Sequence, residues 1–391
     1  MKITNIRQRS YQYHSARKIG DANWPLGFND MVGGFTFIDT DEGITGVSLG
    51  GSSAVKNLAP LLLGEDPRGV IGLWQRLINA VFKGGNEGEY HAAICALDTA
   101  LWDLKAKIND EPLWRTLGAR EGRCKAYASG IDMCLTDDEL RAFYRGKAVQ
   151  GIDAGKLKVG LDITADLRRL AIVQQELQRA SPHPMLMIDS NEYWSPKQAI
   201  RFIHQFEEQF DLTWVEEPAR RWDYRGLRLV SQSIRAAVAT GENLNDASDF
   251  YPLILNEAVD IIEVGMGTSG ITGAMQVAHM AAGFEIPVAM MNCPGNLMAH
   301  LAAALPNHMM MEVVDAGREV CWSADNHIEN GCIVLGKQPG LGITIDEEQL
   351  TALERETAAH PRPPSPPRSR RHGAGLYIVP VTDGERARDA N

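Results

Sequence analysis

Three stretches of the sequence share one pattern, in which a short apolar run ends in an acidic residue: PMLMIDSN at 184–191, LTWVEEP at 212–218 and AAVATGEN at 236–243. The acidic residues are Asp189, Glu216 and Glu242, at intervals of 27 and 26 positions. Each interval is the length of one strand–helix unit. The pattern therefore predicts three consecutive parallel strands, each with a carboxylate at its carboxyl end.

The same rhythm continues on both sides of these stretches. Five further apolar runs are strand candidates: CKAYASG at 124–130, AGKLKVG at 154–160, VDIIEVG at 259–265, IPVAMMN at 286–292 and HMMMEVV at 308–314. Amphipathic segments at 165–180 and 196–210 are typical of the helices between such strands. Eight strands with helical intervals predict a (β/α)8 TIM barrel in which one helix is reduced or replaced. A three-layer α/β sheet is the alternative, and the count of eight disfavours it.

The regions outside the barrel segment have other patterns. Residues 1–50 alternate in the manner of antiparallel strands, interrupted by a loop at 20–31 that carries Trp24 and is either a lid or a surface loop. The apolar spacing at 92–108 predicts a long buried helix. The Pro- and Arg-rich segment 360–372 predicts an extended or disordered linker.

Composition narrows the class of protein. With 391 residues, 44% hydrophobic and 23% charged, the chain is long enough for a barrel and a smaller companion domain. The formal net charge of −11 argues against nucleic acid or an anionic membrane surface as the main partner. Six scattered cysteines, an N-terminus without a signal peptide and the lack of a long apolar run all predict a cytoplasmic protein.

The acidic trio predicts a metal site. In a barrel, carboxylates at the ends of neighbouring strands converge on one side of the mouth, where they would repel one another without a cation. Oxygen ligands in this number suit Mg²⁺. A single strand-end Asp is usually a helix cap, but that explanation does not fit three at regular spacing. Asn191, Glu217 and Asn243 stand beside the three.

Two lysines lie on the strand before the trio. Lys156 and Lys158 alternate in AGKLKVG, so both side chains point to the same side of the strand. Burying two lysines inside a barrel is costly unless carboxylates pair with them or they have a catalytic role. A simpler alternative is an edge strand with two surface lysines. Close to a cation and to each other, their pKa values are expected to fall. Lys158 then removes the proton next to a metal-bound carboxylate, and Lys156 supports the developing charge.

In these motifs the chain resembles the enolase superfamily, in its mandelate racemase and muconate lactonizing enzyme branch. The resemblance covers roughly residues 1–350 and rests on seven motifs: KLK at 156–158, DSN at 189–191, WVEEP at 214–218, TGEN at 240–243, ALDTALWDLKAK at 96–107, SGITG at 269–273 and MEVVDAG at 311–317.

The resemblance implies a division into domains. An α+β capping domain, residues 1–122, would close over a modified barrel at 123–320 with (β/α)7β connectivity. Residues 321–391 would return to the cap. The resemblance also implies Asp189, Glu216 and Glu242 as Mg²⁺ ligands and Lys158 as the base. A hydrogen bond from Glu312 to the substrate carboxylate is implied as well.

The chain departs from the family where many members carry a catalytic histidine–aspartate pair. Where those members have the histidine, at the end of the seventh strand, this chain has Asn292, or Met291 if the register differs by one. The aspartate expected on the sixth strand falls on Val264 or Gly265. His300 lies in the following helical segment and is predicted to be structural. Two-base racemization is therefore disfavoured, and a one-base reaction is expected.

The leading hypothesis is dehydration of a sugar acid to a 2-keto-3-deoxy acid, with Asn191, Asn243 and Asn292 binding hydroxyl groups and Trp24 contacting the substrate. Glu263 and Tyr90 are candidates for the missing acid. A racemase or epimerase acting on an α-substituted carboxylate is the second hypothesis. The third is a paralogue that binds an acid and magnesium without turnover. Large barrel enzymes commonly assemble symmetrically, so a homo-oligomer is expected.

Overall fold

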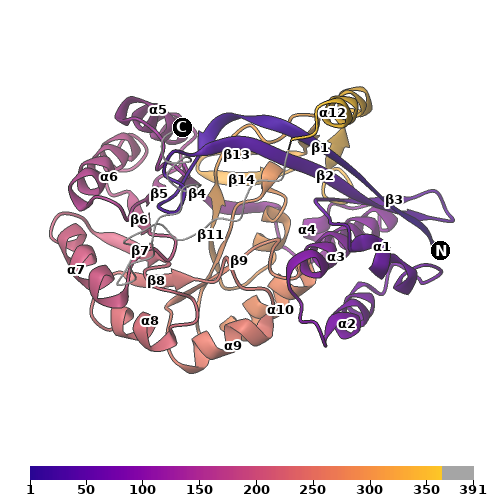
Figure 1. Ribbon diagram of the computed structural model, residues 1–391, viewed down its shortest axis with the longest axis horizontal. Helices are drawn as coiled ribbons and strands as arrows, with labels where there is room; N and C mark the ends of the chain where they lie inside the picture. The colour runs from indigo at the N-terminus through magenta and orange to yellow at the C-terminus, as the bar shows by residue number, and fades with distance from the viewer. Residues whose placement is uncertain (363–391) are drawn as a thin grey trace.

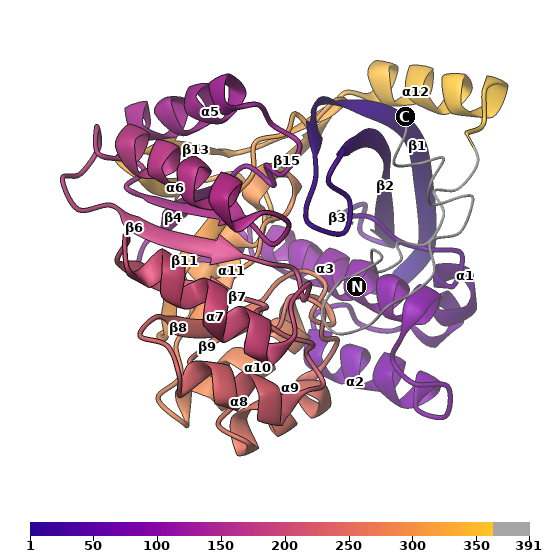
Figure 2. The same cartoon turned by 60° about the vertical axis from the view of Figure 1, so that its left-hand side comes forward.

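The structure is a computed structural model that describes residues 1–362 (Figure 1). The expected linker at 360–372 lies almost wholly outside the described residues. The capping sheet and its helices lie to one side of the barrel (Figure 2). Within the described part of the chain, no helix is both long and apolar enough to cross a membrane.

Among residues 1–362, eight parallel strands form the barrel: β4 (Arg123–Ser129), β5 (Ala154–Lys158), β6 (Met185–Asp189), β7 (Leu212–Glu216), β8 (Ala237–Thr240), β9 (Ile261–Val264), β10 (Val288–Met290) and β11 (His308–Val313). Each strand pairs with the next, and β11 pairs with β4 to close the barrel. Every strand candidate of the sequence is thus confirmed, and so is the TIM-barrel fold.

A helix follows each of the first seven barrel strands: α5 (Asp137–Val149), α6 (Ile163–Leu177), α7 (Pro196–Glu207), α8 (Tyr224–Ser231), α9 (Ala247–Leu255), α10 (Gly270–Ala282) and α11 (Ala299–Ala302). Helix α11 is a single turn, which confirms that one barrel helix is reduced. After β11 the described chain continues into short antiparallel strands rather than an eighth barrel helix.

The barrel interior follows the two-residue period of its strands. Alternate residues pack inward into a core of their own: Tyr127, Ala154, Met187, Trp214, Ala239, Ile261, Ala289, Met291 and Met310. Lys156 and Lys158 have the same parity as Ala154 and therefore point inward from β5. The interior is thus apolar at its centre and charged where the strands end.

The cap begins with an antiparallel sheet of β1 (Ile3–Ile19), β2 (Phe28–Thr40) and β3 (Thr45–Leu49). Its helical part is α1 (Val55–Leu58), the 3₁₀ turn η1 (Ala59–Leu61), α2 (Val70–Val81), α3 (Gly88–Ile108) and α4 (Leu113–Thr116). The loop expected at 20–31 is shorter, because its last residues pair with β1. It spans 20–27.

Helix α3 fixes the cap on the barrel. Its Asp98 is fully buried and accepts hydrogen bonds from the backbone N–H and the hydroxyl of Thr272 in α10, over 2.8 and 2.6 Å. Trp102, one turn further along α3, donates its indole N–H to the same hydroxyl over 2.9 Å. Because these groups are buried and satisfied, they define one relative position of the two elements.

The C-terminal segment returns to both domains. Strands β13 (Asn326–Glu329) and β14 (Cys332–Leu335) extend the barrel sheet beyond β4, whereas β12 (Trp322–Ala324) pairs with β15 (Ile343–Ile345). Helix α12 (Glu347–Ala359) lies against β1, where Arg9 forms ion pairs with Glu347 and Glu354. The division at 122 and 320 stays a prediction.

Candidate active site

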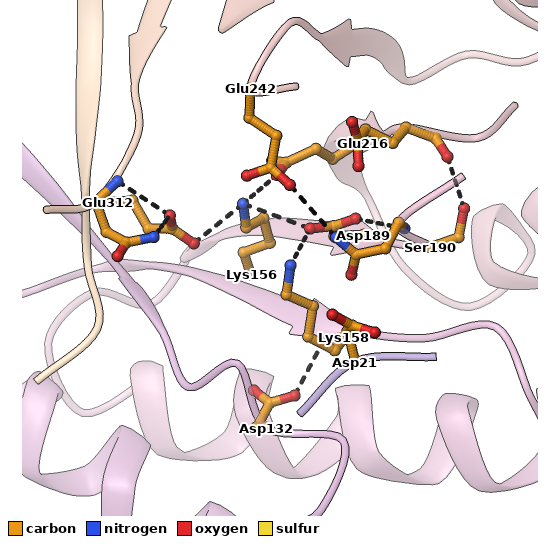
Figure 3. A network of polar contacts seen from close by, with 12 residues as sticks. Asp21, Asp132, Lys156, Lys158, Asp189, Ser190, Glu216, Glu242 and Glu312 are labelled. Carbon is orange, nitrogen blue, oxygen red and sulfur yellow. Dashed lines mark hydrogen bonds and ion pairs between the residues drawn. The ribbon is translucent and has the colours of Figure 1, made fainter. Parts of the chain in front are cut away.

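Two lysines and four carboxylates meet at the mouth, the end of the barrel at which the strands' carboxyl ends lie (Figure 3). Lys158 forms an ion pair with Asp189, and Lys156 forms one with Glu216. Lys156 Nζ also lies 3.7 Å from Asp189 Oδ2 and 3.1 Å from Glu312 Oε1. These five side chains are at most 5% exposed, and the fourth carboxylate is that of Glu242 (Figure 3). The strand register explains the grouping, because Lys158 is paired with Asp189, and Asp189 with Glu216.

The carboxylates around the two lysines decide the direction of the lysine pKa shifts. Burial acts to lower the pKa of both lysines, but the surrounding carboxylates outweigh it. Glu216 and Glu312 raise the pKa of Lys156 well above its usual value, and Asp189 raises that of Lys158. The fall expected for lysines close to a bound cation stays a prediction. Burial also raises the pKa of Glu216, to about 8, although Lys156 acts against it.

A second chain of contacts leads away from Lys156. Glu312 accepts hydrogen bonds at Oε2 from the side-chain amide and the backbone N–H of Asn292, over 2.6 and 3.2 Å. Asn292 Oδ1 in turn accepts from Arg318 Nη1 over 2.9 Å. Burial acts to raise the pKa of Glu312, but Lys156 and Lys158 lower it to about 2, so this side chain is a carboxylate.

The predicted metal ligands fit a hard cation by donor type. Asp189, Glu216 and Glu242 offer only oxygen, as Mg²⁺ prefers. Among residues 1–362, no group of three acidic, histidine or cysteine side chains is already arranged as a metal site. Asp189 and Glu216 are instead paired with the two lysines. Asn191 Oδ1 and Glu217 Oε2 are buried oxygens beside the trio that have no hydrogen-bond partner among residues 1–362. Such unsatisfied oxygens are what a bound cation or its water would satisfy.

The cap loop at 20–27 contacts the mouth. Asn23 Nδ2 donates to the backbone oxygen of Asn191 over 2.9 Å, and Gly20 forms a bridge with Asp132 after β4. Trp24, the predicted substrate contact, lies in this loop with its ring 5.9 Å from that of Phe28. The loop is thus attached to two of the segments that follow barrel strands.

Asp132 supports Lys158 and was missed by sequence reasoning. Its fully buried carboxylate accepts from the backbone N–H of Lys158 over 3.0 Å and from the hydroxyl of Tyr144 over 2.8 Å. Arg169 donates to the backbone oxygen of Asp132 over 2.6 Å. An aspartate in a loop without periodic neighbours carries no signal of this role in the sequence.

The remaining candidates have different surroundings. Glu263 is fully buried on β9, facing inward, and burial and Glu216 raise its pKa well above the usual value. Tyr90 is 40% exposed at the start of α3, where its hydroxyl lies 3.5 Å from Asn57 Nδ2, so it faces the cap. His300 is buried in α11 and accepts from the backbone N–H of Trp114 over 3.1 Å, as a structural histidine does.

Sequence comparison identifies the family. Residues 139–349 match the family model described as enolase C-terminal domain-like, and residues 35–118 match the N-terminal domain of mandelate racemase and muconate lactonizing enzymes. Together with the capped barrel, these matches define a class of barrel enzymes. The chain belongs to the enolase superfamily, in its mandelate racemase and muconate lactonizing enzyme branch.

Characterised relatives have related but different activities. A 3,6-anhydro-alpha-L-galactonate cycloisomerase from Streptomyces coelicolor is 30% identical over 81% of this chain and 90% of its own. An L-talarate/galactarate dehydratase from Salmonella typhimurium is 31% identical over 75% of this chain and 73% of its own. Similar enzymes are thus mostly sugar acid dehydratases, with some isomerases and epimerases.

Solved structures agree in fold. A racemase from Streptomyces coelicolor with bound magnesium superimposes with a TM-score of 0.81 at 27% identity, covering 90% of this chain and 99% of its own. An L-talarate dehydratase from a Polaromonas species, complexed with Mg and L-glucarate, has a TM-score of 0.80 at 29% identity, over 90% and 96% of the two chains. Both neighbours are magnesium-bound proteins of this fold.

Proposed function

We propose that this protein is a magnesium-dependent dehydratase of sugar acids, which converts a hydroxy acid to a 2-keto-3-deoxy acid. The observation that carries the proposal is the position of Lys158 and Lys156. Both are buried at the mouth and each forms an ion pair with a carboxylate at the end of another barrel strand. Buried lysines among carboxylates are expected at a site for proton transfer rather than in a structural core.

The proposed ligands are Asp189, Glu216 and Glu242. A divalent cation, when bound, supplies positive charge that neutralises the dianion formed as the α-proton leaves. The ion pair with Asp189 raises the pKa of Lys158 and so keeps its amine protonated. Once Asp189 no longer pairs with it, Lys158 can lose that proton and accept the α-proton as a neutral amine.

The α C–H bond breaks as Lys158 takes the proton, and the electron pair forms the C=C bond as the β C–O bond breaks. The leaving hydroxide takes a proton from the Lys158 ammonium group and departs as water. The enol then becomes the ketone as its hydroxyl loses a proton and the β-carbon gains one.

Lys156 is proposed to hold the substrate carboxylate, and Glu312 is proposed to position Lys156. Lys156 is fully buried and lies 3.1 Å from Glu312, so a cation and a hydrogen-bonding oxygen stand together beside the ligands. Glu312 in turn is oriented by Asn292. The ammonium group of Lys156 stabilises negative charge on the carboxylate oxygens as it develops.

Two observations favour a sugar acid as the substrate. The mouth carries amide groups, and Asn191 has a buried side-chain oxygen without a partner among the described residues, which can accept a hydroxyl proton. Several similar enzymes are named as dehydratases of sugar acids, among them arabinonate dehydratase and D-mannonate dehydratase.

An isomerase is the second candidate. The specific observation is the similarity to a cycloisomerase of an anhydro sugar acid, together with a one-base mouth that needs no histidine on the seventh strand. Such an enzyme would also use Lys158 as its base, but its product would be an isomer of the substrate, because no water is lost.

The test is product formation from a panel of aldonates, uronates and aldarates incubated with Mg²⁺. A 2-keto product from at least one acid is expected for the wild-type chain, and none from Lys158→Ala. Lys125→Ala is the matched control, because Lys125 is an exposed lysine paired with Asp153 over 3.2 Å. Absence of a 2-keto product with every acid would contradict the dehydratase, and an isomeric product would favour the second candidate.

A further inference from the structure

Three residues that follow the proposed ligands have left-handed backbone conformations. Asn191 and Glu192 come after Asp189 with φ of 46° and 57°, and Glu217 comes after Glu216 with φ of 43°. Asparagine tolerates this conformation, but glutamate does not favour it. Strained residues of this kind persist only where their surroundings hold them in place. The turns after β6 and β7 therefore depend on contacts from outside.

The carboxylate of Glu192 is the first of these contacts. It is 3% exposed and accepts from Arg221 Nε over 2.6 Å at Oε1 and from Arg221 Nη2 over 3.1 Å at Oε2. The backbone N–H of Arg221 and the side chain of Arg220 add bonds of 3.1 and 3.2 Å. The buried charge is thus fully paired by a two-pronged arginine, which also fixes its direction.

The same guanidinium extends to a third loop. Arg221 Nη1 donates over 2.9 Å to the backbone oxygen of Asn243, the residue directly after Glu242. The side-chain amide of Asn243 then donates to Glu217 Oε1 over 2.8 Å. One side chain therefore connects the loops after β6, β7 and β8, and each of these loops contains or directly follows one proposed ligand.

We propose that Arg221 is a positioning residue that holds the three ligand-bearing loops in the arrangement a magnesium ion requires. The inference rests on the proposed function. Mg²⁺ requires near-octahedral geometry and tolerates displaced ligands poorly. Loss of a residue that orients metal ligands typically weakens metal binding by about 10- to 100-fold.

Arg220 provides a matched control. Its side chain is 27% exposed against 29% for Arg221, and both guanidinium groups lie near the ring of Trp222, at 5.5 and 5.8 Å. Both arginines bond to Glu192, but among the described residues the bond to Asn243 comes from Arg221. Removing either cation reduces repulsion of Mg²⁺, so charge alone predicts equal or tighter binding in both variants.

The experiment is calorimetric titration of the full-length chain with Mg²⁺. Arg221→Met is expected to bind Mg²⁺ about 10- to 100-fold more weakly than the wild type. Arg220→Met is expected to bind within about twofold of the wild type or more tightly. Arg221→Lys keeps a cation near Glu192 but lacks the fork that reaches Asn243, so it is also expected to lose about tenfold or more. If Arg221→Met does not fold, the titration of Arg221→Lys tests the inference in its place.

If both Arg221 variants bind Mg²⁺ as tightly as Arg220→Met does, the inference is overturned but the proposed function is not. A wild-type chain that binds no Mg²⁺ would overturn both. The two failures are thus distinguished by the wild-type titration.

Discussion

Asn292 donates its side-chain amide to Glu312 over 2.6 Å while its own side-chain oxygen accepts from Arg318 over 2.9 Å. Both ends of the amide are engaged, so its orientation is fixed. An amide also does not ionise at ordinary pH, so it does not act as a general acid or base. Asn292, at the position of the family's histidine, therefore links Glu312 to the guanidinium group of Arg318. Among residues 1–362, Lys158 is then the evident base at the mouth.

Asn292→Ala tests this link. The substitution removes a hydrogen bond to a charged group, which is worth about 1.5–3 kcal/mol. If that bond serves the transition state, kcat/KM for the best acid of the panel falls about 10- to 100-fold. Steady-state kinetics and a thermal melt together check the prediction. An unchanged kcat/KM in a folded variant would show that Glu312 needs no such support.

Asp132→Ala is expected to destabilise the chain strongly. It removes the carboxylate beside the buried side chain of Arg169 and the acceptor of the Lys158 N–H. Breaking a buried pair in this way costs about 3–5 kcal/mol. Urea denaturation measures the loss, with Asp137→Ala as the control, since Asp137 forms an exposed pair with Arg168. Equal losses in the two variants would contradict the supporting role of Asp132.

Asp98 should make the stability of the chain depend on pH. Burial raises its pKa from 3.8 to about 7, so between these values the folded chain binds more protons than the unfolded chain. Stability contributed by protonated Asp98 is full below about pH 4 and is lost as pH rises to about 7, by up to roughly 4 kcal/mol.

Asp98→Asn should remove this part of the pH dependence. The difference in unfolding free energy between wild type and variant, measured from pH 4 to 7, checks it. A difference that does not change with pH would mean that Asp98 titrates normally.

Magnesium should stabilise the folded chain. A ligand at 100 times its Kd contributes about 2.7 kcal/mol, so Mg²⁺ should raise Tm and a chelator should reverse the rise. Glu242→Gln should reduce this shift, because its carboxylate is a proposed ligand that accepts hydrogen bonds from the side-chain amides of Asn191 and Asn243. The exposed Glu257→Gln serves as the control. An identical Mg²⁺ shift in both variants would count against Glu242 as a ligand.

The barrel and the grouping of charges were predictable because they follow from periodicity. Apolar runs of fixed spacing give the strands, and a two-residue period gives the direction of Lys156 and Lys158. Carboxylates that end adjacent parallel strands must meet at one edge. The family assignment follows from the same motifs, and the matched domains confirm it.

The supporting residues were not predictable, for two physical reasons. Arg221, Asp132 and Arg318 lie in loops, where the direction of a side chain depends on turns that have no repeating pattern. The start of β2 was missed because Phe28 pairs with Ile19 across an irregularity in β1. The lysine pKa values were expected to fall close to a cation, and without one the paired carboxylates raise them.

Exchange of the α-proton tests the central claim most directly. The chain is incubated with Mg²⁺ and the panel of acids in deuterated water, and deuterium at the α-carbon and in the keto product is followed by NMR. We predict deuterium-labelled 2-keto product with the wild type and neither label nor product with Lys158→Ala. Exchange at the wild-type rate in Lys158→Ala would contradict the account, because another group would then remove the proton.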